Sequence, residues 1–257
     1  MRKTYVIGNW KMNGSLAANK ALLAGLKAGV PAAKANVAIA VCPPFVYLPS
    51  VVDAVSGSPI GVGSQDVSEY DKGAYTGEVP VAMLKEVGVT YAVIGHSERR
   101  SLFGETDEWV AKKTVAALAG GLVPVVCIGE LEAEREGGLT EKVLATQLDA
   151  VLAAIPNPVP GSIVVAYEPV WAIGTGKTAT PEMAQETHAF IRNYLKKGGE
   201  AFAQDTAILY GGSVKASNAA GLFAMPDIDG GLVGGASLIV EEFVGIYNAA
   251  ADQFGKR

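Results

Sequence analysis

The chain has very few of the residues on which disulfide scaffolds and metal centres depend. Among its 257 residues there are two cysteines, Cys42 and Cys127, and two histidines, His96 and His188. Each cysteine ends an apolar run, and no Cys-x-x-Cys or His-Glu-x-x-His motif is present. We therefore expect buried, reduced thiols rather than a disulfide, and neither residue type predicts a metal site.

Basic blocks and long apolar runs are also missing. The net charge is −5, and no run of Lys or Arg is long enough to indicate a nucleic-acid-binding surface. No apolar stretch reaches the roughly 18 residues of a membrane-spanning helix. The first residues, MRKTYV, lack the apolar core of a secretion signal. We expect a cytoplasmic protein that binds neither nucleic acid nor a membrane.

What the chain does contain is apolar sequence in a regular order. Hydrophobic residues make up 49% of it, which is enough for one large core. Stretches with helical spacing separate eight short apolar runs, at 4–8, 37–42, 60–64, 90–95, 122–128, 162–167, 206–210 and 230–234. Such alternation predicts a parallel sheet, because parallel strands need crossover helices. We therefore expect an α/β fold with one domain over 1–257. Eight units in about 250 residues favour a closed parallel (β/α)8 barrel over an open sheet.

Three separated segments place polar residues directly after such runs. They are GNWKMN at 8–13, IGHSERR at 94–100 and YEPVWAIGTGK at 167–177. An Asn/Lys pair, a His and a Glu each stand at the carboxyl end of a predicted strand, where parallel α/β folds carry their chemistry. We interpret the three segments as parts of one active site.

Each of these side chains also has a simpler interpretation. His96 is a catalyst, a satisfied core residue or a surface residue. Glu168 is a base, a turn cap or a lysine partner. The neighbours of Glu168 are mostly apolar, which raises the basicity of a carboxylate, as a general base requires. Asn9 and Lys11 alternate, so they point to the same side of an extended chain. Lys11 is either an exposed charge or the main cation for an oxyanion or phosphate, and His188 is either structural or solvent-facing.

Two glycine pairs follow the last two runs. One precedes Ser213, and the other is Gly234-Gly235. Without side chains, backbone N–H groups can approach an anion closely, and a phosphate site after these two strands recurs in barrels of this kind. The alternative is a pair of ordinary turns.

A third glycine segment, GTGKT at 174–178, is similar to the end of a nucleotide-binding P-loop. That motif needs a glycine where Trp171 stands, so we exclude nucleotide binding. We expect a mobile lid over 169–177, with an ordinary surface loop as the alternative.

Six segments in order carry a family resemblance: NWKMN at 9–13, GHSERR at 95–100, CIGE at 127–130, AYEPVWAIGTG at 166–176, YGGSV at 210–214 and LVGGASL at 232–238. Together they resemble the signatures of the triosephosphate isomerase family. The resemblance covers the chain from end to end and implies a (β/α)8 TIM barrel. It also implies an isomerase of glycolysis and gluconeogenesis that interconverts dihydroxyacetone phosphate and D-glyceraldehyde 3-phosphate by proton transfer through an enediolate.

The resemblance implies a role for each matching residue. Glu168 would move the proton between the two carbons, and neutral His96 would donate to the carbonyl oxygens, a pairing known from this family itself. Lys11 would supply positive charge and Asn9 an amide donor. Glu98 would be a partner for the region of Lys11 and His96.

The same resemblance implies how the phosphate is held and what is not required. Backbone N–H groups of Gly174, Ser213, Gly234 and Gly235 would bind the phosphate of the triose phosphate substrate. No cofactor and no metal would be needed.

The segment GAYTGEV at 73–79 resembles the loop through which members of this family form homodimers. The resemblance implies a homodimer in which the loop around Tyr75 and Thr76 approaches the Asn9 region of the neighbouring subunit.

Two other functions remain open at this point. A phosphate-binding aldolase or lyase would typically place a Schiff-base lysine in a late strand, and the runs at 162–167 and 206–210 contain none. A barrel that binds without catalysis would not need all four of Asn9, Lys11, His96 and Glu168.

Overall fold

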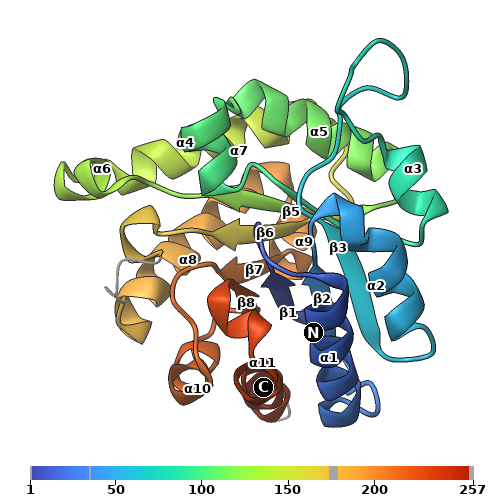
Figure 1. Ribbon diagram of the computed structural model, residues 1–257. Helices are drawn as coiled ribbons and strands as arrows, with labels where there is room; N and C mark the ends of the chain where they lie inside the picture. The colour runs from blue at the N-terminus through green and yellow to red at the C-terminus, as the bar shows by residue number, and fades with distance from the viewer. Residues whose placement is uncertain (1, 35, 174–178, 255–257) are drawn as a thin grey trace.

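The protein is described by a computed structural model at residues 2–34, 36–173 and 179–254. Eight parallel strands form a closed barrel in which each strand pairs with its neighbours in sequence, as predicted (Figure 1). The strands are β1 Thr4–Asn9, β2 Val37–Cys42, β3 Ile60–Ser64, β4 Tyr91–Ile94, β5 Val123–Ile128, β6 Val164–Tyr167, β7 Ala207–Tyr210 and β8 Gly230–Val233. Each falls on one of the eight apolar runs, with ends that differ by two residues at most.

The barrel closes where β8 pairs with β1. Tyr5 lies opposite Gly230 in this pairing, and Ile7 lies opposite Leu232. A Cβ atom on Gly230 would lie 1.9 Å from the carbonyl oxygen of Tyr5, and Gly230 has a φ of +122°. Only glycine fits here, because both the contact and the left-handed backbone exclude a side chain.

Helices surround the barrel. They are α1 Leu16–Gly29, α2 Leu48–Val55, α3 Val81–Glu86, α4 Ser97–Phe103, α5 Asp107–Ala119, α6 Glu132–Glu136, α7 Thr140–Ala154, α8 Pro181–Leu195, α9 Glu200–Asp205, α10 Ala216–Phe223 and α11 Val240–Phe254. Short 3₁₀ turns lie at η1 Phe45–Tyr47, η2 Val170–Ala172, η3 Lys196–Gly198 and η4 Gly235–Leu238. The hydroxyl of Thr180 accepts a hydrogen bond from the N–H of Met183 and so caps α8, which begins with Pro181.

The apolar residues separate into two layers. The larger layer fills the space between strands and helices and includes Trp10, which is fully buried. The smaller layer consists of strand residues alone, at alternate positions, and therefore fills the inside of the barrel. Cys42 and Cys127 belong to this inner layer as free, buried thiols, which confirms the prediction that they are not disulfide-bonded.

One segment projects away from the barrel. The connection between β3 and α3, residues 65–80, extends from the body at the top of Figure 1. Its tip, residues 71–78, is exposed. The rings of Tyr70 and Tyr75 stack at 3.8 Å between centroids, and the N–H of Ser68 donates to the carbonyl of Val79. The loop is thus braced across its base and along its length.

His188 is a structural residue of α8 rather than a solvent-facing one. It is fully buried, with Nδ1 lying 3.2 Å from the carbonyl oxygen of Asp227 and its ring edge-on to Tyr167. Four positions along the same helix, Arg192 pairs with Asp227 and Asp229. Burial lowers the pKa of His188 to about 3.

This buried histidine predicts a loss of stability in acid. Because the folded state resists protonation, the stabilisation is complete above the ordinary pKa of about 6.5 and is lost progressively as the pH falls towards about 3. The contribution is at most about 5 kcal/mol. We expect the unfolding free energy in urea to fall less steeply between pH 7 and pH 4 in His188→Gln than in the original chain. Parallel curves for the two proteins would contradict the assignment.

Candidate active site

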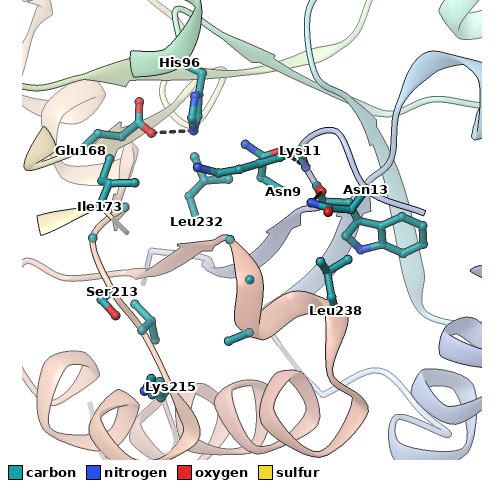
Figure 2. Close-up of a pocket in the computed structure, with 17 residues that line it drawn as sticks. Asn9, Lys11, Asn13, His96, Glu168, Ile173, Ser213, Lys215, Leu232 and Leu238 are labelled. Carbon is teal, nitrogen blue, oxygen red and sulfur yellow. Dashed lines mark hydrogen bonds and ion pairs between the residues drawn. The ribbon is translucent and has the colours of Figure 1, made fainter. Parts of the chain in front are cut away.

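The residues predicted from the sequence meet at the carboxyl ends of the strands. A cavity of about 330 Å³ is lined by residues of β1 and β8 and of the segments that follow β1, β4, β6, β7 and β8. It includes Asn9, Lys11, His96, Glu168, Ser213, Gly234 and Gly235 (Figure 2). Gly174, predicted to bind phosphate, lies outside the described residues, as does the rest of the predicted lid from 175 to 177.

His96 and Glu168 contact one another at one side of this cavity. Nε2 of His96 lies 2.9 Å from Oε1 of Glu168 (Figure 2), and both side chains are almost completely buried. Glu168 also accepts a hydrogen bond of 2.9 Å from the backbone N–H of Ser97, which follows His96. The β6 strand ends at Tyr167, but its pairing continues for one residue, because the N–H of Glu168 donates to the carbonyl of Ile128 over 2.7 Å.

The other nitrogen of His96 caps a helix. His96 precedes α4, and its Nδ1 accepts a hydrogen bond of 3.2 Å from the N–H of Glu98. An N–H group can only donate, so this bond requires Nδ1 to be unprotonated. The proton of a neutral ring is then on Nε2, where it points at Glu168.

Opposing influences act on the charge of His96. Burial lowers its pKa, whereas the carboxylates of Glu168 and Glu98 raise it, and the net direction from these influences is upward. The hydrogen bond from the Glu98 N–H acts against protonation, because it exists only with the neutral ring. We take His96 to be neutral, because only the neutral ring can accept from the Glu98 N–H at Nδ1 and donate to Glu168 from Nε2.

Lys11 adopts a conformation that alternation alone does not predict. β1 ends at Asn9, and Lys11 has a φ of +51°, so the extended chain that we expected does not continue. The backbone of Lys11 is held on both sides. Its N–H donates to Oδ1 of Asn9 over 3.0 Å, and its carbonyl accepts from Nε2 of Gln65 over 2.8 Å. Asn9 and Lys11 nevertheless both line the cavity.

The ammonium group of Lys11 is paired with a carboxylate. Nζ of Lys11 donates to Oε1 of Glu98, and Oε2 of Glu98 lies 3.7 Å from Nδ1 of His96. Glu98 therefore contacts both Lys11 and His96, although it does not line the cavity itself.

The far side of the cavity is made of backbone with little covering it. Ser213 follows β7, Gly234 lies between β8 and η4, and Gly235 begins η4. A Cβ atom on Gly235 would meet nothing within 4 Å, and one on Gly234 would meet only the Lys11 side chain at 3.6 Å. This backbone is therefore open to a ligand of the cavity.

Several lining residues were not predicted from the sequence. They are Trp10, Asn13, Ile173, Val214, Lys215, Leu232, Ala236 and Leu238. Leu232 could have been found, because it takes an inward-facing position of β8. The others lie in turns, where neither period nor strand position indicates the direction of a side chain.

In the described part of the chain, no group of three or more His, Cys, Asp or Glu side chains is arranged to hold a metal ion. No helix among those residues is long and apolar enough to cross a membrane.

Comparison with known proteins shows the family of the chain. The family model described as triosephosphate isomerase matches residues 4–250. A triosephosphate isomerase of Thiobacillus denitrificans is 59% identical over 98% of this chain and all of its own length. Those of Herminiimonas arsenicoxydans and Cupriavidus taiwanensis are 56% and 57% identical over 97% of this chain and all of their own. The chain belongs to the triosephosphate isomerase family.

Proposed function

We propose that the chain interconverts dihydroxyacetone phosphate and D-glyceraldehyde 3-phosphate, with Glu168 as the base and His96 as the electrophile. The contact of 2.9 Å between Nε2 of His96 and Oε1 of Glu168 carries the proposal. It brings a carboxylate that can accept a proton and an N–H that can donate one to within one hydrogen bond of each other, in a cavity of about 330 Å³.

The reaction needs a proton to leave one carbon and return to its neighbour. Glu168 takes the proton from the carbon beside the carbonyl, and the electrons of that C–H bond form the enediolate. Nε2–H of His96 donates to the oxygen on which negative charge develops. Glu168 then returns the proton to the other carbon. The proton of the neighbouring hydroxyl passes through Nε2 of His96 to the former carbonyl oxygen, which leaves the new carbonyl on the first carbon. No electron leaves the substrate, so the steps call for no redox cofactor.

Charge and backbone complete the proposed site. Lys11 supplies the cation that faces the substrate, with Asn9 beside it as an amide donor. Backbone N–H groups of Ser213, Gly234 and Gly235 bind the phosphate, which fits the open backbone on that side of the cavity. Gly174 joins them in the same role, on the resemblance alone.

Substrate in this site has to displace an existing contact. Glu168 is bonded to Ser97 and His96. The base therefore exchanges these partners for the substrate carbon, and Nε2–H of His96 becomes available to the substrate oxygen at the same time. This exchange couples the two catalytic groups.

The proposal extends to the assembly and place of the protein. We propose one barrel domain over residues 1–257 that forms a homodimer in the cytoplasm and acts in glycolysis and gluconeogenesis. The projecting loop supports the dimer, since Tyr75 is 41% exposed at its tip. So do large apolar side chains exposed near the site, Met12, Leu102 and Phe103, which a partner would cover.

Replacing the base tests the function directly. Glu168→Gln keeps the shape of the side chain and cannot accept the proton. We expect kcat to fall by about 10²–10⁴ with little change in KM. A coupled assay of glyceraldehyde 3-phosphate formation measures both constants, with Glu86→Gln on the exposed face of α3 as a control. A kcat in Glu168→Gln equal to that of the original chain would remove Glu168 from the mechanism.

Charges at the loop tip test the dimer. Tyr75→Glu combined with Thr76→Glu would bury unpaired charge in the proposed interface, at a cost of several kcal/mol per ion. We expect sedimentation to show monomers and activity to fall, although no catalytic residue has changed. Val159→Glu, at another exposed apolar position, is the control and should remain dimeric. A double variant that stays dimeric would show that this loop is not the interface.

A further inference from the structure

Both polar atoms of the Gln147 side-chain amide form hydrogen bonds with a single residue, Gly129. It lies on the buried face of α7, between Leu144 and Leu148, where a polar group is costly unless it is hydrogen-bonded. Its Oε1 accepts from the N–H of Gly129 over 2.8 Å, and its Nε2 donates to the carbonyl of Gly129 over 3.1 Å. The two partners fix the orientation of the amide, because an N–H only donates and a carbonyl only accepts.

The register of the sheet explains why Gly129 needs such a partner. β4 ends at Ile94, which lies opposite Val126, whereas the pairing of β5 with β6 continues beyond that point. The carbonyls of Ile128 and Glu130 accept from Glu168 and Val170 on the β6 side. The N–H and carbonyl of Gly129 alternate with these groups and face the side where β4 has already ended. The amide of Gln147 occupies the place of the missing strand.

Gly129 in turn lies directly against the backbone of Glu168. A Cβ atom on Gly129 would lie 1.8 Å from the carbonyl oxygen of Glu168 and 3.3 Å from its Cα. The peptide groups of the two residues are therefore in close contact, and the position of Gly129 determines where the backbone of Glu168 can lie.

A second cavity shows that packing alone does not hold this region. It has a volume of about 390 Å³ and is lined by Gln147, Gly129 and Glu168, together with apolar side chains such as Ile128 and Val143. Residues that line a cavity have room to move into it. Hydrogen bonds, rather than surrounding side chains, must then keep Gly129 in place.

We propose that Gln147 is a positioning residue for Glu168, which it holds through Gly129 without touching the substrate. This inference rests on the proposed function, in which Glu168 is the general base. Loss of the two hydrogen bonds lets the end of β5 move into the cavity and carries the Glu168 backbone with it. Asn9, Lys11, Gly234 and Gly235 belong to β1 and to the segments that follow β1 and β8, so they keep their places.

Gln147→Met tests the proposal, because methionine has the length of glutamine and makes neither bond. We expect kcat to fall about 10-fold to 100-fold, as for a displacement of about 1 Å. KM and the inhibition constant of inorganic phosphate should change by less than about 3-fold, because the phosphate side of the cavity is unaffected. A KM that rises with kcat unchanged would overturn the proposal.

A matched control separates positioning from stability. Gln185 on α8 also forms hydrogen bonds from both amide atoms to one residue, Asp227. Its Nε2 donates to a carboxylate oxygen of Asp227 over 2.7 Å, and its Oε1 accepts from the Asp227 N–H over 3.0 Å. Gln185→Met thus loses the same number of hydrogen bonds away from the site. It should lower Tm and leave kcat unchanged. An equal loss of kcat in both variants would make Gln147 merely structural.

The same substitution in the Glu168→Gln background shows whether Gln147 acts through the base. If it does, adding Gln147→Met lowers kcat by less than about 2-fold, because the group it positions no longer accepts the proton. If the kcat losses of Gln147→Met and Glu168→Gln multiply in the double variant, the proposal for Gln147 is overturned, whereas the proposed function of the protein is not affected. If Glu168→Gln alone keeps its kcat, the proposed function fails instead, so the two failures are distinguishable.

A second variant keeps the test open if Gln147→Met does not fold. Gln147→Glu retains an acceptor for the Gly129 N–H and loses the donor to its carbonyl. We expect the same fall in kcat with KM preserved. A folded Gln147→Glu protein with the kcat of the original chain would overturn the proposal.

Discussion

The site depends on the closure of the sheet between β8 and β1. Pairing through Gly230 and Tyr5 makes a ring of parallel strands, and in such a ring all carboxyl ends lie on one rim. Asn9, His96, Glu168 and Ser213 are far apart in the sequence and share a cavity for this reason alone. A side chain at Gly230 would keep the backbones of β1 and β8 apart, and the two parts of the site that they carry would separate with them.

Much of this fold could be predicted because it depends on repetition. Eight apolar runs separated by helical stretches favour a barrel over an open sheet before any single residue is considered, and the strands form on those runs. The polar residues at the ends of the runs could be found by the same logic. Placing His96 and Glu168 on one rim needs only the strand order, and the resemblance to a family added their roles.

The contacts that hold these groups could not be predicted in the same way. The left-handed conformation of Lys11 and its support by Gln65 depend on where β1 ends relative to the neighbouring turns. The contact between Gln147 and Gly129 depends on β4 being shorter than β5, which is a property of register. His188 had two interpretations in the sequence, and only the packing of α8 against the barrel shows that it is buried. Periodicity gives the direction of a side chain within an element and says little about partners that another element supplies.

The double use of the His96 ring has a further consequence. One ring nitrogen faces Glu168 and the cavity, and the other holds the N–H of Glu98 in the first turn of α4. A proton that reached Nδ1 would remove the helix cap as well as the neutral catalyst. The protection of the Glu98 amide against exchange with solvent deuterium is therefore tied to the charge of His96. Exchange at this one backbone amide of α4 therefore reports the charge of His96 in the active site, and it does so without substrate.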